Sequence, residues 1–297
     1  MDNTSTKEKA RQVQKIPAYP LHYLDGHRIY RRIQGENWQT TTYLEREPKG
    51  GGKGKAMSET KQATNLKGAI KRLRYIIRAN FGYNSENEAH ITLTYKGSMQ
   101  DTEKLKRDLQ VFLKRLRRGY PNHTLDYVAV MEPHGHGGWH IHLLLKSDRP
   151  VWLANGVDDY LCYDKVREMW RAAIGGGGGT RHERLPEDVT DLGRYFGAYF
   201  DTAIPEDVEL SGDREAIKKA SKAAVKGSRL HFYPADFKFY RTSKGIIRPK
   251  SVKCFFDYEE MKSGFRPTYT AHYAIAGEDG TPTQFAQTTD WKRKEVN

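Results

Sequence analysis

The segment that most constrains the fold is a pair of apolar runs joined by a short turn rich in glycine and proline. The first run covers residues 127–131, the turn reads PHGHGG over residues 133–138, and the second run covers residues 139–146. Two runs of this length around such a turn predict a β-hairpin. The chain is therefore expected to contain an antiparallel sheet built on this hairpin.

Other periodic segments predict a mixture of helices and strands. The segment HITLTY at residues 90–95 alternates between polar and apolar residues, which predicts a half-buried strand with His90, Thr92 and Thr94 on one face. Residues 229–234 and the tail from residue 251 predict further strands. The absence of a regular βαβ period favours an α+β fold over a doubly wound one. Helical periodicity and end signals predict helices over residues 58–79, 102–118, 163–174, 190–201 and 214–226.

Composition divides the chain into three parts. Residues 1–58 are polar and contain the run KGGGKGK, which predicts a partly flexible N-terminal extension. Residues 59–250 are expected to form the functional domain, and residues 251–297 a β-rich tail packed on that domain or following it. A second glycine run, Gly175–Gly179, lacks the Gly-Lys-Ser/Thr ending of a phosphate-binding loop, so it favours a plain flexible loop.

The charge balance of the chain indicates a polyanionic partner. Lysine and arginine outnumber aspartate and glutamate by 50 to 37, which gives a net charge of +13. The two cysteines, Cys162 and Cys254, form neither a disulfide framework nor a zinc ribbon and fit a reducing compartment. No apolar run approaches the ~20 residues that span a bilayer, and the N-terminus lacks the apolar core of a secretory signal. We therefore expect a cytoplasmic protein without a membrane partner.

The second strand of the hairpin carries a candidate metal site. His140 and His142 are two residues apart and so project from one face of the strand. If the turn is symmetric about His136, Glu132 lies opposite His140 with its Cβ atom ~5 Å away, and it completes a three-ligand site. Such a site leaves positions open for a substrate oxygen. The histidine pair taken alone is more typical of ordinary packing in a half-buried strand.

A predicted helix supplies two candidate nucleophiles. Tyr195 and Tyr199 are about one helical turn apart, which places their hydroxyl groups on one side of the helix. The helix alone is more typical of amphipathic core tyrosines. Beside a metal site in a basic protein, however, a tyrosine oxygen can attack a phosphodiester and conserve the bond as a phosphotyrosine.

Four segments together resemble the HUH endonuclease superfamily, which is named for its His-hydrophobic-His triplet. VAVMEPHGHGGWHIHLLLKS (128–147) is similar to the metal-binding motif of this superfamily, and HITLTYKG (90–97) to its first motif strand. DLGRYFGAYFD (191–201) resembles the two-tyrosine motif of rolling-circle replication initiators of phages, plasmids and integrated mobile elements. VKGSRLHFYPADFKFYRTSKGIIRP (225–249) resembles the C-terminal half of that branch.

The resemblance implies a fold, a reaction and a set of partners. The fold is a central antiparallel sheet that carries the HUH motif between flanking helices, in a ferredoxin-like arrangement. The reaction is the nicking of single-stranded or hairpin origin DNA, with Mg²⁺ or Mn²⁺ held by Glu132, His140 and His142 and with Tyr195 and Tyr199 as nucleophiles. A host helicase and polymerase would complete replication. The alternatives are a relaxase or transposase of the same superfamily, and a non-catalytic DNA-binding regulator on the same fold.

Two of the predicted helices carry the candidate phosphate contacts. Cationic side chains of this kind lower the free energy of binding to a polyanion, although a charged run is often only a solvated face. The candidates are Lys71, Arg72, Arg74, Lys114, Arg115, Arg117 and Arg118.

Overall fold

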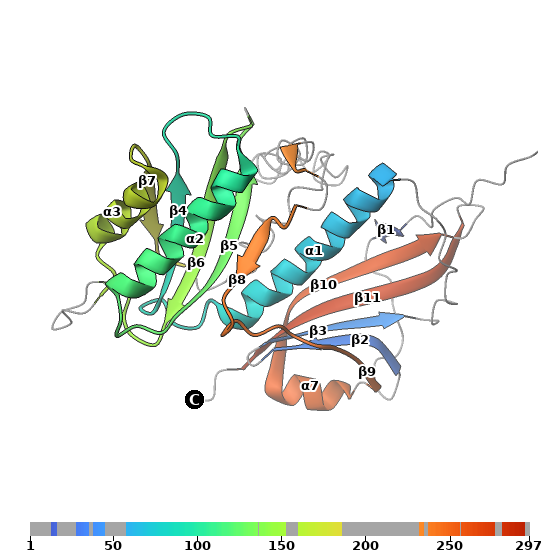
Figure 1. Ribbon diagram of the computed structural model, residues 1–297. Coiled ribbons are helices and arrows are strands. Elements are labelled where there is room, and N and C mark those ends of the chain that lie inside the picture. Colours follow the sequence, from blue (N-terminus) through green and yellow to red (C-terminus); the bar gives the residue numbers. More distant parts are fainter. Residues whose placement is uncertain are drawn as a thin grey trace, which may run out of the picture. The chain divides into compact units, whose positions relative to one another are not determined.

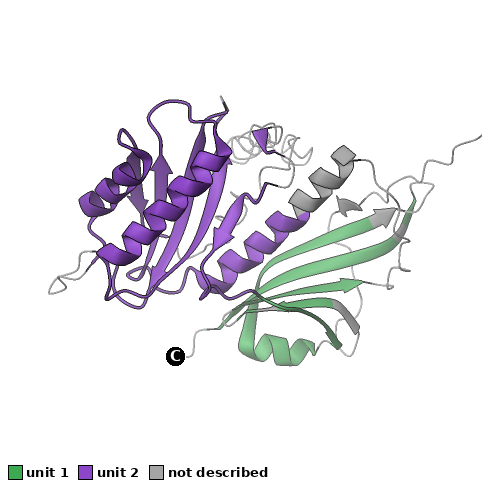
Figure 2. Cartoon of the chain, viewed as in Figure 1, with its two compact units in different colours: residues 1–55, 249–297 green, residues 56–248 purple. Residues whose placement is uncertain are grey.

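The computed structural model divides the chain into two compact units (Figure 2). One unit combines residues 1–55 with residues 249–297, and the other consists of residues 56–248. The structure describes residues 13–16, 28–35, 38–44, 58–135, 137–152, 160–185, 232–234, 237–255, 257–276 and 281–294. Within these residues, no helix is both long enough and apolar enough to cross a membrane.

The larger unit contains a five-stranded antiparallel sheet with the strand order β7-β4-β6-β5-β8. The predicted hairpin is present as β5 and β6, and the predicted strand at residues 90–95 is present as β4, beside β6. The mixed α+β class with an antiparallel sheet is thus confirmed, while the ferredoxin-like arrangement stays a prediction. The strands are β4 (Glu88–Thr94), β5 (Leu125–Pro133), β6 (Trp139–Ser147), β7 (Gly179–Glu183) and β8 (Tyr240–Thr242).

Three helices of this unit match the helical periods of the sequence. They are α1 (Ser58–Asn80), α2 (Thr102–Gly119) and α3 (Tyr163–Ile174). α2 begins at a capping residue, because the Asp101 carboxylate accepts hydrogen bonds of 2.9 Å from the backbone N–H groups of Glu103 and Lys104. The apolar stripe of α2 is buried in the core; its members are Leu105, Leu109, Phe112, Leu113 and Leu116.

The two faces of the sheet have different surroundings. α2 and α3 lie side by side against one face, in front of the sheet in Figure 1. The Tyr95 hydroxyl, at the end of β4, donates to the Asp108 carboxylate of α2 at 3.1 Å, and the Trp170 indole of α3 packs edge-on against the Tyr95 ring. Tyr95 shares the alternation of Leu93, which stands opposite Ile141, so the apolar residues of both strands face these helices.

The glycine run after α3 has a defined conformation, so the prediction of a plain flexible loop is wrong. Gly175 ends α3 in the left-handed region with φ of 83°, which glycine adopts without strain. A Cβ atom on Gly178 would lie 2.6 Å from the Thr94 carbonyl oxygen, so only glycine allows this approach to β4. The last glycine of the run, Gly179, begins β7, which pairs with β4 and forms an edge of the sheet.

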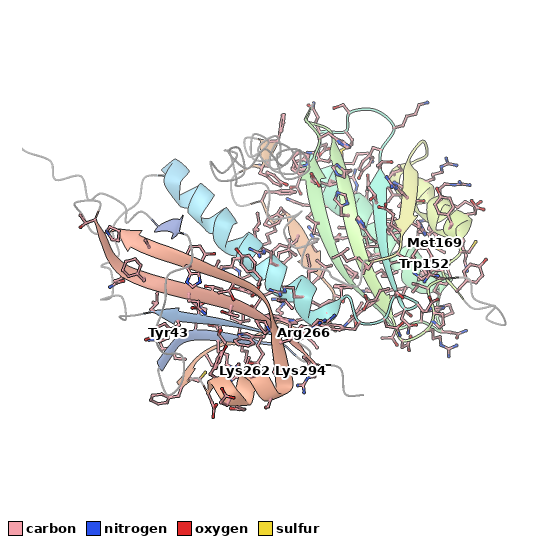
Figure 3. The ribbon with its side chains drawn as sticks, turned by 180° about the vertical axis from the view of Figure 1, so that it is seen from behind. Tyr43, Trp152, Met169, Lys262, Arg266 and Lys294 are labelled. Carbon is pink, nitrogen blue, oxygen red and sulfur yellow. The ribbon has the colours of Figure 1, made fainter. Side chains whose placement is uncertain are left out.

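The smaller unit contains a six-stranded sheet with the order β1-β10-β11-β3-β2-β9, in which all pairs are antiparallel. The helix α7 (Tyr258–Gly264) precedes β10, and the Lys294 ammonium donates to the Lys262 carbonyl oxygen at 2.5 Å (both labelled in Figure 3). The strands are β1 (Val13–Ile16), β2 (Arg28–Gln34), β3 (Trp38–Leu44), β9 (Ser251–Phe255), β10 (Phe265–Ala276) and β11 (Pro282–Arg293).

Two predictions outside the hairpin differ from the structure. Residues 1–58, expected as a partly flexible extension, contain three strands, because Thr40, Thr41 and their neighbours pair with the distant strand β11. Residues 232–234, expected at the end of a strand, form no strand, and residues 229–231 lie outside the described residues. The predicted helices over 190–201 and 214–226 also lie outside the described residues.

Candidate metal centre

The β5–β6 hairpin brings Glu132, His140 and His142 together. Glu132 stands opposite His140 in the strand register, as the symmetry of the turn predicts. The turn closes with a hydrogen bond of 2.6 Å from the His134 N–H to the Gly138 carbonyl oxygen. Since His140 and His142 project from the same face of β6, all three side chains lie on one face of the sheet.

Three potential ligand atoms converge between these side chains. The His142 Nε2 atom lies 2.9 Å from the His140 Nε2 atom and 2.9 Å from the Glu132 Oε2 atom, and the His140 Nε2 atom lies 3.4 Å from the same oxygen. Two ligands bound at right angles to one cation with bonds of ~2.1 Å are ~3 Å apart. The separations therefore suit a group that could hold one metal ion.

The burial of the cluster adds an electrostatic reason for a cation. Glu132 is 1% exposed, His140 6% and His142 5%. A carboxylate removed from water is costly unless a positive charge or hydrogen-bond donors compensate it. Two imidazole nitrogens and a carboxylate oxygen suit a divalent ion, and three protein ligands leave further positions for a substrate.

The turn contributes a third histidine beside the cluster. The His134 ring is stacked on the His140 ring, with centroids 4.0 Å apart and planes inclined by 22°. The sequence placed His134 and His136 in the turn without a defined direction; His136 lies outside the described residues. The stacking shows that His134 helps to hold the plane of the His140 ring.

The neighbouring strand β4 supplies a histidine that sequence reasoning did not assign to the site. The His90 Nε2 atom lies 3.0 Å from the His142 Nδ1 atom, and burial lowers the pKa of His90 from its ordinary 6.5 to about 3. The alternation of HITLTY placed His90 and Thr92 on one face, and this was the available signal. Glu183, on the edge strand β7, had no signal because the glycine run concealed that strand.

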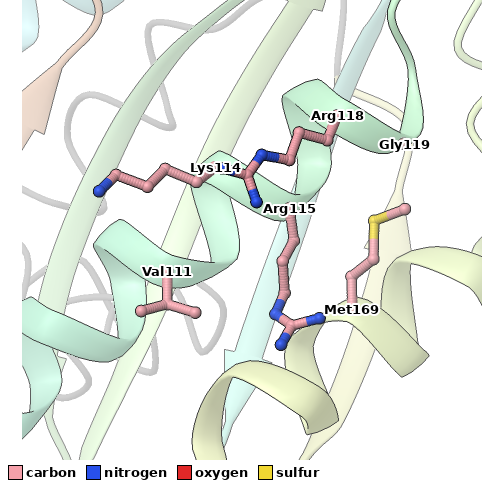
Figure 4. A pocket seen from close by; sticks show the side chains of 6 residues that line it. All are labelled: Val111, Lys114, Arg115, Arg118, Gly119 and Met169. Atoms are coloured by element: carbon pink, nitrogen blue, oxygen red, sulfur yellow. The ribbon is translucent and has the colours of Figure 1, made fainter.

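The predicted phosphate contacts fall on two separate helices. Lys114, Arg115 and Arg118 of α2 line a hollow of about 460 Å³, together with Val111 and Gly119 of α2 and Met169 of α3 (Figure 4). Arg117 is also exposed on α2, and its guanidinium lies 5.8 Å from the centre of the Tyr127 ring.

The remaining predicted residues are not all in view. Lys71 and Arg72 are exposed on α1, and Arg74 is half-buried on the same helix. Tyr195 and Tyr199 lie outside the described residues, so the structure does not relate them to the metal cluster.

Comparison with known proteins gives one match. A family model of replication-associated proteins of the ORF2 type matches residues 88–203, which is less than half of the chain and includes β4, the hairpin and both candidate tyrosines. No curated protein and no solved structure matches the chain. The match is consistent with a role in the initiation of replication.

Proposed function

We propose that this protein is a metal-dependent endonuclease and strand transferase that nicks single-stranded origin DNA and so initiates rolling-circle replication. The observation that carries the proposal is the buried cluster of Glu132, His140 and His142 inside the region similar to a replication-associated family. A buried triad with open positions has the composition that phosphodiester chemistry requires.

In the proposed reaction, a tyrosine of the predicted helix is the nucleophile. The phenol oxygen of Tyr195 or Tyr199 forms a bond to phosphorus, the bond to the leaving deoxyribose oxygen breaks, and the proton lost by the phenol balances the proton gained by that oxygen. A divalent ion, Mg²⁺ or Mn²⁺, would polarise the scissile phosphate when bound. Glu132, His140 and His142 would hold the ion, and the covalent bond would preserve the strand end for rejoining.

The cations of α1 and α2 support binding to DNA before the reaction. The exposed side chains of Lys114, Arg115 and Arg118 around one hollow can contact several phosphates, and each contact releases a counterion. The proposal places the reaction in the cytoplasm and leaves unwinding and synthesis to a host helicase and polymerase.

The test is the capture and mapping of a covalent adduct. The full chain is incubated with Mn²⁺ and labelled single-stranded DNA from both sides of its gene, then denatured, digested and mapped by mass spectrometry. We expect DNA on Tyr195 or Tyr199, and no adduct in the Tyr195→Phe/Tyr199→Phe variant or in the His140→Ala/His142→Ala variant. Tyr258→Phe, in the smaller unit, is the matched control and should form the adduct normally.

Other results would overturn the mechanism or the function. An adduct at another residue, or full cleavage in excess chelator, contradicts the proposed mechanism. Tight binding to the flanking DNA without any cleavage would instead indicate a non-catalytic DNA-binding regulator.

A further inference from the structure

Four side chains form a row across the face of the sheet that carries the metal cluster. Glu183 on β7 stands opposite His90 on β4, and His90 is diagonal to His142 on β6, whose other neighbour is Glu132 on β5. The His90 Nδ1 atom lies 3.6 Å from the Glu183 Oε2 atom. The His90 Nε2 atom lies 3.0 Å from His142 Nδ1, and His142 Nε2 lies 2.9 Å from Glu132 Oε2.

The positions of the protons along this row follow from metal ligation. A neutral imidazole that binds a cation through Nε2 carries its proton on Nδ1. The His142 Nδ1–H group then donates to the lone pair on His90 Nε2. His90 in turn carries its proton on Nδ1, which faces the carboxylate of Glu183.

We propose that His90 is a positioning residue for the ligand His142: it accepts the Nδ1–H of His142 and so directs the Nε2 lone pair of His142 toward the metal. Glu183 orients His90 from the edge strand. The inference rests on the metal centre of the proposed function and adds the group that fixes one of its ligands. Outer hydrogen bonds of this kind fix ring orientation and raise the affinity of a ligand for its metal.

The contacts of the neighbouring groups single out His90 for this role. The Thr92 hydroxyl also approaches His142 Nδ1, but at the longer distance of 3.5 Å. The Nδ1 atom of the other histidine ligand, His140, is buried and has no hydrogen-bond partner among the described residues. The structure thus supports one of the two histidine ligands with a dedicated acceptor, and His90 is the closer of the two groups at that atom.

Calorimetric titration of the full chain with Mn²⁺ alone tests the inference. His90→Leu keeps an apolar side chain of similar size but no acceptor, and we expect it to weaken Mn²⁺ binding by roughly 10- to 100-fold. His90→Gln restores a side-chain oxygen of similar reach, and it should recover much of the affinity. His182→Gln is the matched control: it replaces a half-buried histidine of β7 that stands opposite Ile91, on the other face of the sheet.

A second measurement on the wild-type protein needs no variant. Nitrogen NMR of ¹⁵N-histidine-labelled protein loaded with diamagnetic Mg²⁺ should show the proton of His90 on Nδ1. A proton on His90 Nε2, or unchanged Mn²⁺ affinity in a folded His90→Leu variant, would overturn the inference while leaving the metal centre intact. Failure of the wild-type protein to bind Mn²⁺ would instead remove the metal centre on which it rests.

Discussion

The carboxylate of Glu132 and the imidazole of His142 lie 2.9 Å apart, between Oε2 and Nε2, in a part of the sheet that is closed to water. A cation bound between them stabilises the folded chain, because the unfolded chain has no such site. At free Mn²⁺ one hundred times the dissociation constant, the gain is ~2.7 kcal/mol. We therefore expect Mn²⁺ to raise the melting temperature of the wild-type protein.

The variant Glu132→Gln should lose most of this Mn²⁺-dependent rise, since the amide oxygen carries no charge. Glu103→Gln, which alters an exposed carboxylate on α2, should retain it. Differential scanning fluorimetry with and without Mn²⁺ measures both. Equal Mn²⁺-dependent shifts in the two variants would count against the centre.

The cations around the α2 hollow should control the salt dependence of DNA binding. If Lys114, Arg115 and Arg118 each contact a phosphate, their joint replacement by Gln should weaken binding to single-stranded DNA. It should also reduce the slope of log affinity against log salt by ~2. Fluorescence anisotropy at several salt concentrations measures this slope.

A matched variant separates local contacts from net charge. Replacing Lys250, Lys253 and Lys262 by Gln removes three exposed charges from the smaller unit. This variant should bind DNA with the wild-type slope. The same reduction in both variants would mean that only the overall charge of the chain matters.

Gly178 should not tolerate a side chain. Its Cβ atom would lie 2.6 Å from the Thr94 carbonyl oxygen and 2.8 Å from Trp170 Nε1, two atoms that share a hydrogen bond of 2.8 Å. We expect Gly178→Ala to lower the free energy of unfolding by about 1–3 kcal/mol in urea denaturation. Gly135→Ala, at a position with no atom within 4 Å of the new Cβ, should change it little, and similar losses in both would refute this explanation.

Acid should destabilise the protein in part through His182. Burial lowers the pKa of His182 from its ordinary 6.5 to about 4, so the ring is neutral in the folded chain at neutral pH. Between these two values the unfolded state binds more protons, and stability therefore falls as the pH decreases from 6.5 toward 4. In His182→Gln this part of the decline should be absent; urea denaturation at pH 7.5, 5.5 and 4.5 would show it, and identical profiles would contradict it.

The central hairpin could be predicted because its information is local. The two apolar runs and the turn fix the register, and the register places Glu132 opposite His140. The stripe of α2, from Leu105 to Leu116, is equally visible in the sequence because its period is helical.

The missed parts depend on pairings between distant segments. β3 contains three consecutive threonines and reads as polar, and its partner β11 lies more than 200 residues later in the chain. Threonine is nevertheless a good strand former because it is β-branched. The same limit concealed Glu183, whose approach to His90 depends on a strand that begins inside a glycine run.

The placement of α2 against the apolar face of the sheet makes the sheet a partition between two kinds of chemistry. The ligand cluster lies on one side of it, and the exposed cations of α2 point away from the other. Substitutions among those cations can therefore retune how tightly a polyanion is held without disturbing the side chains that bind the ion. A polymer that touches both sides at once must pass around an edge of the sheet, at β7 or at β8.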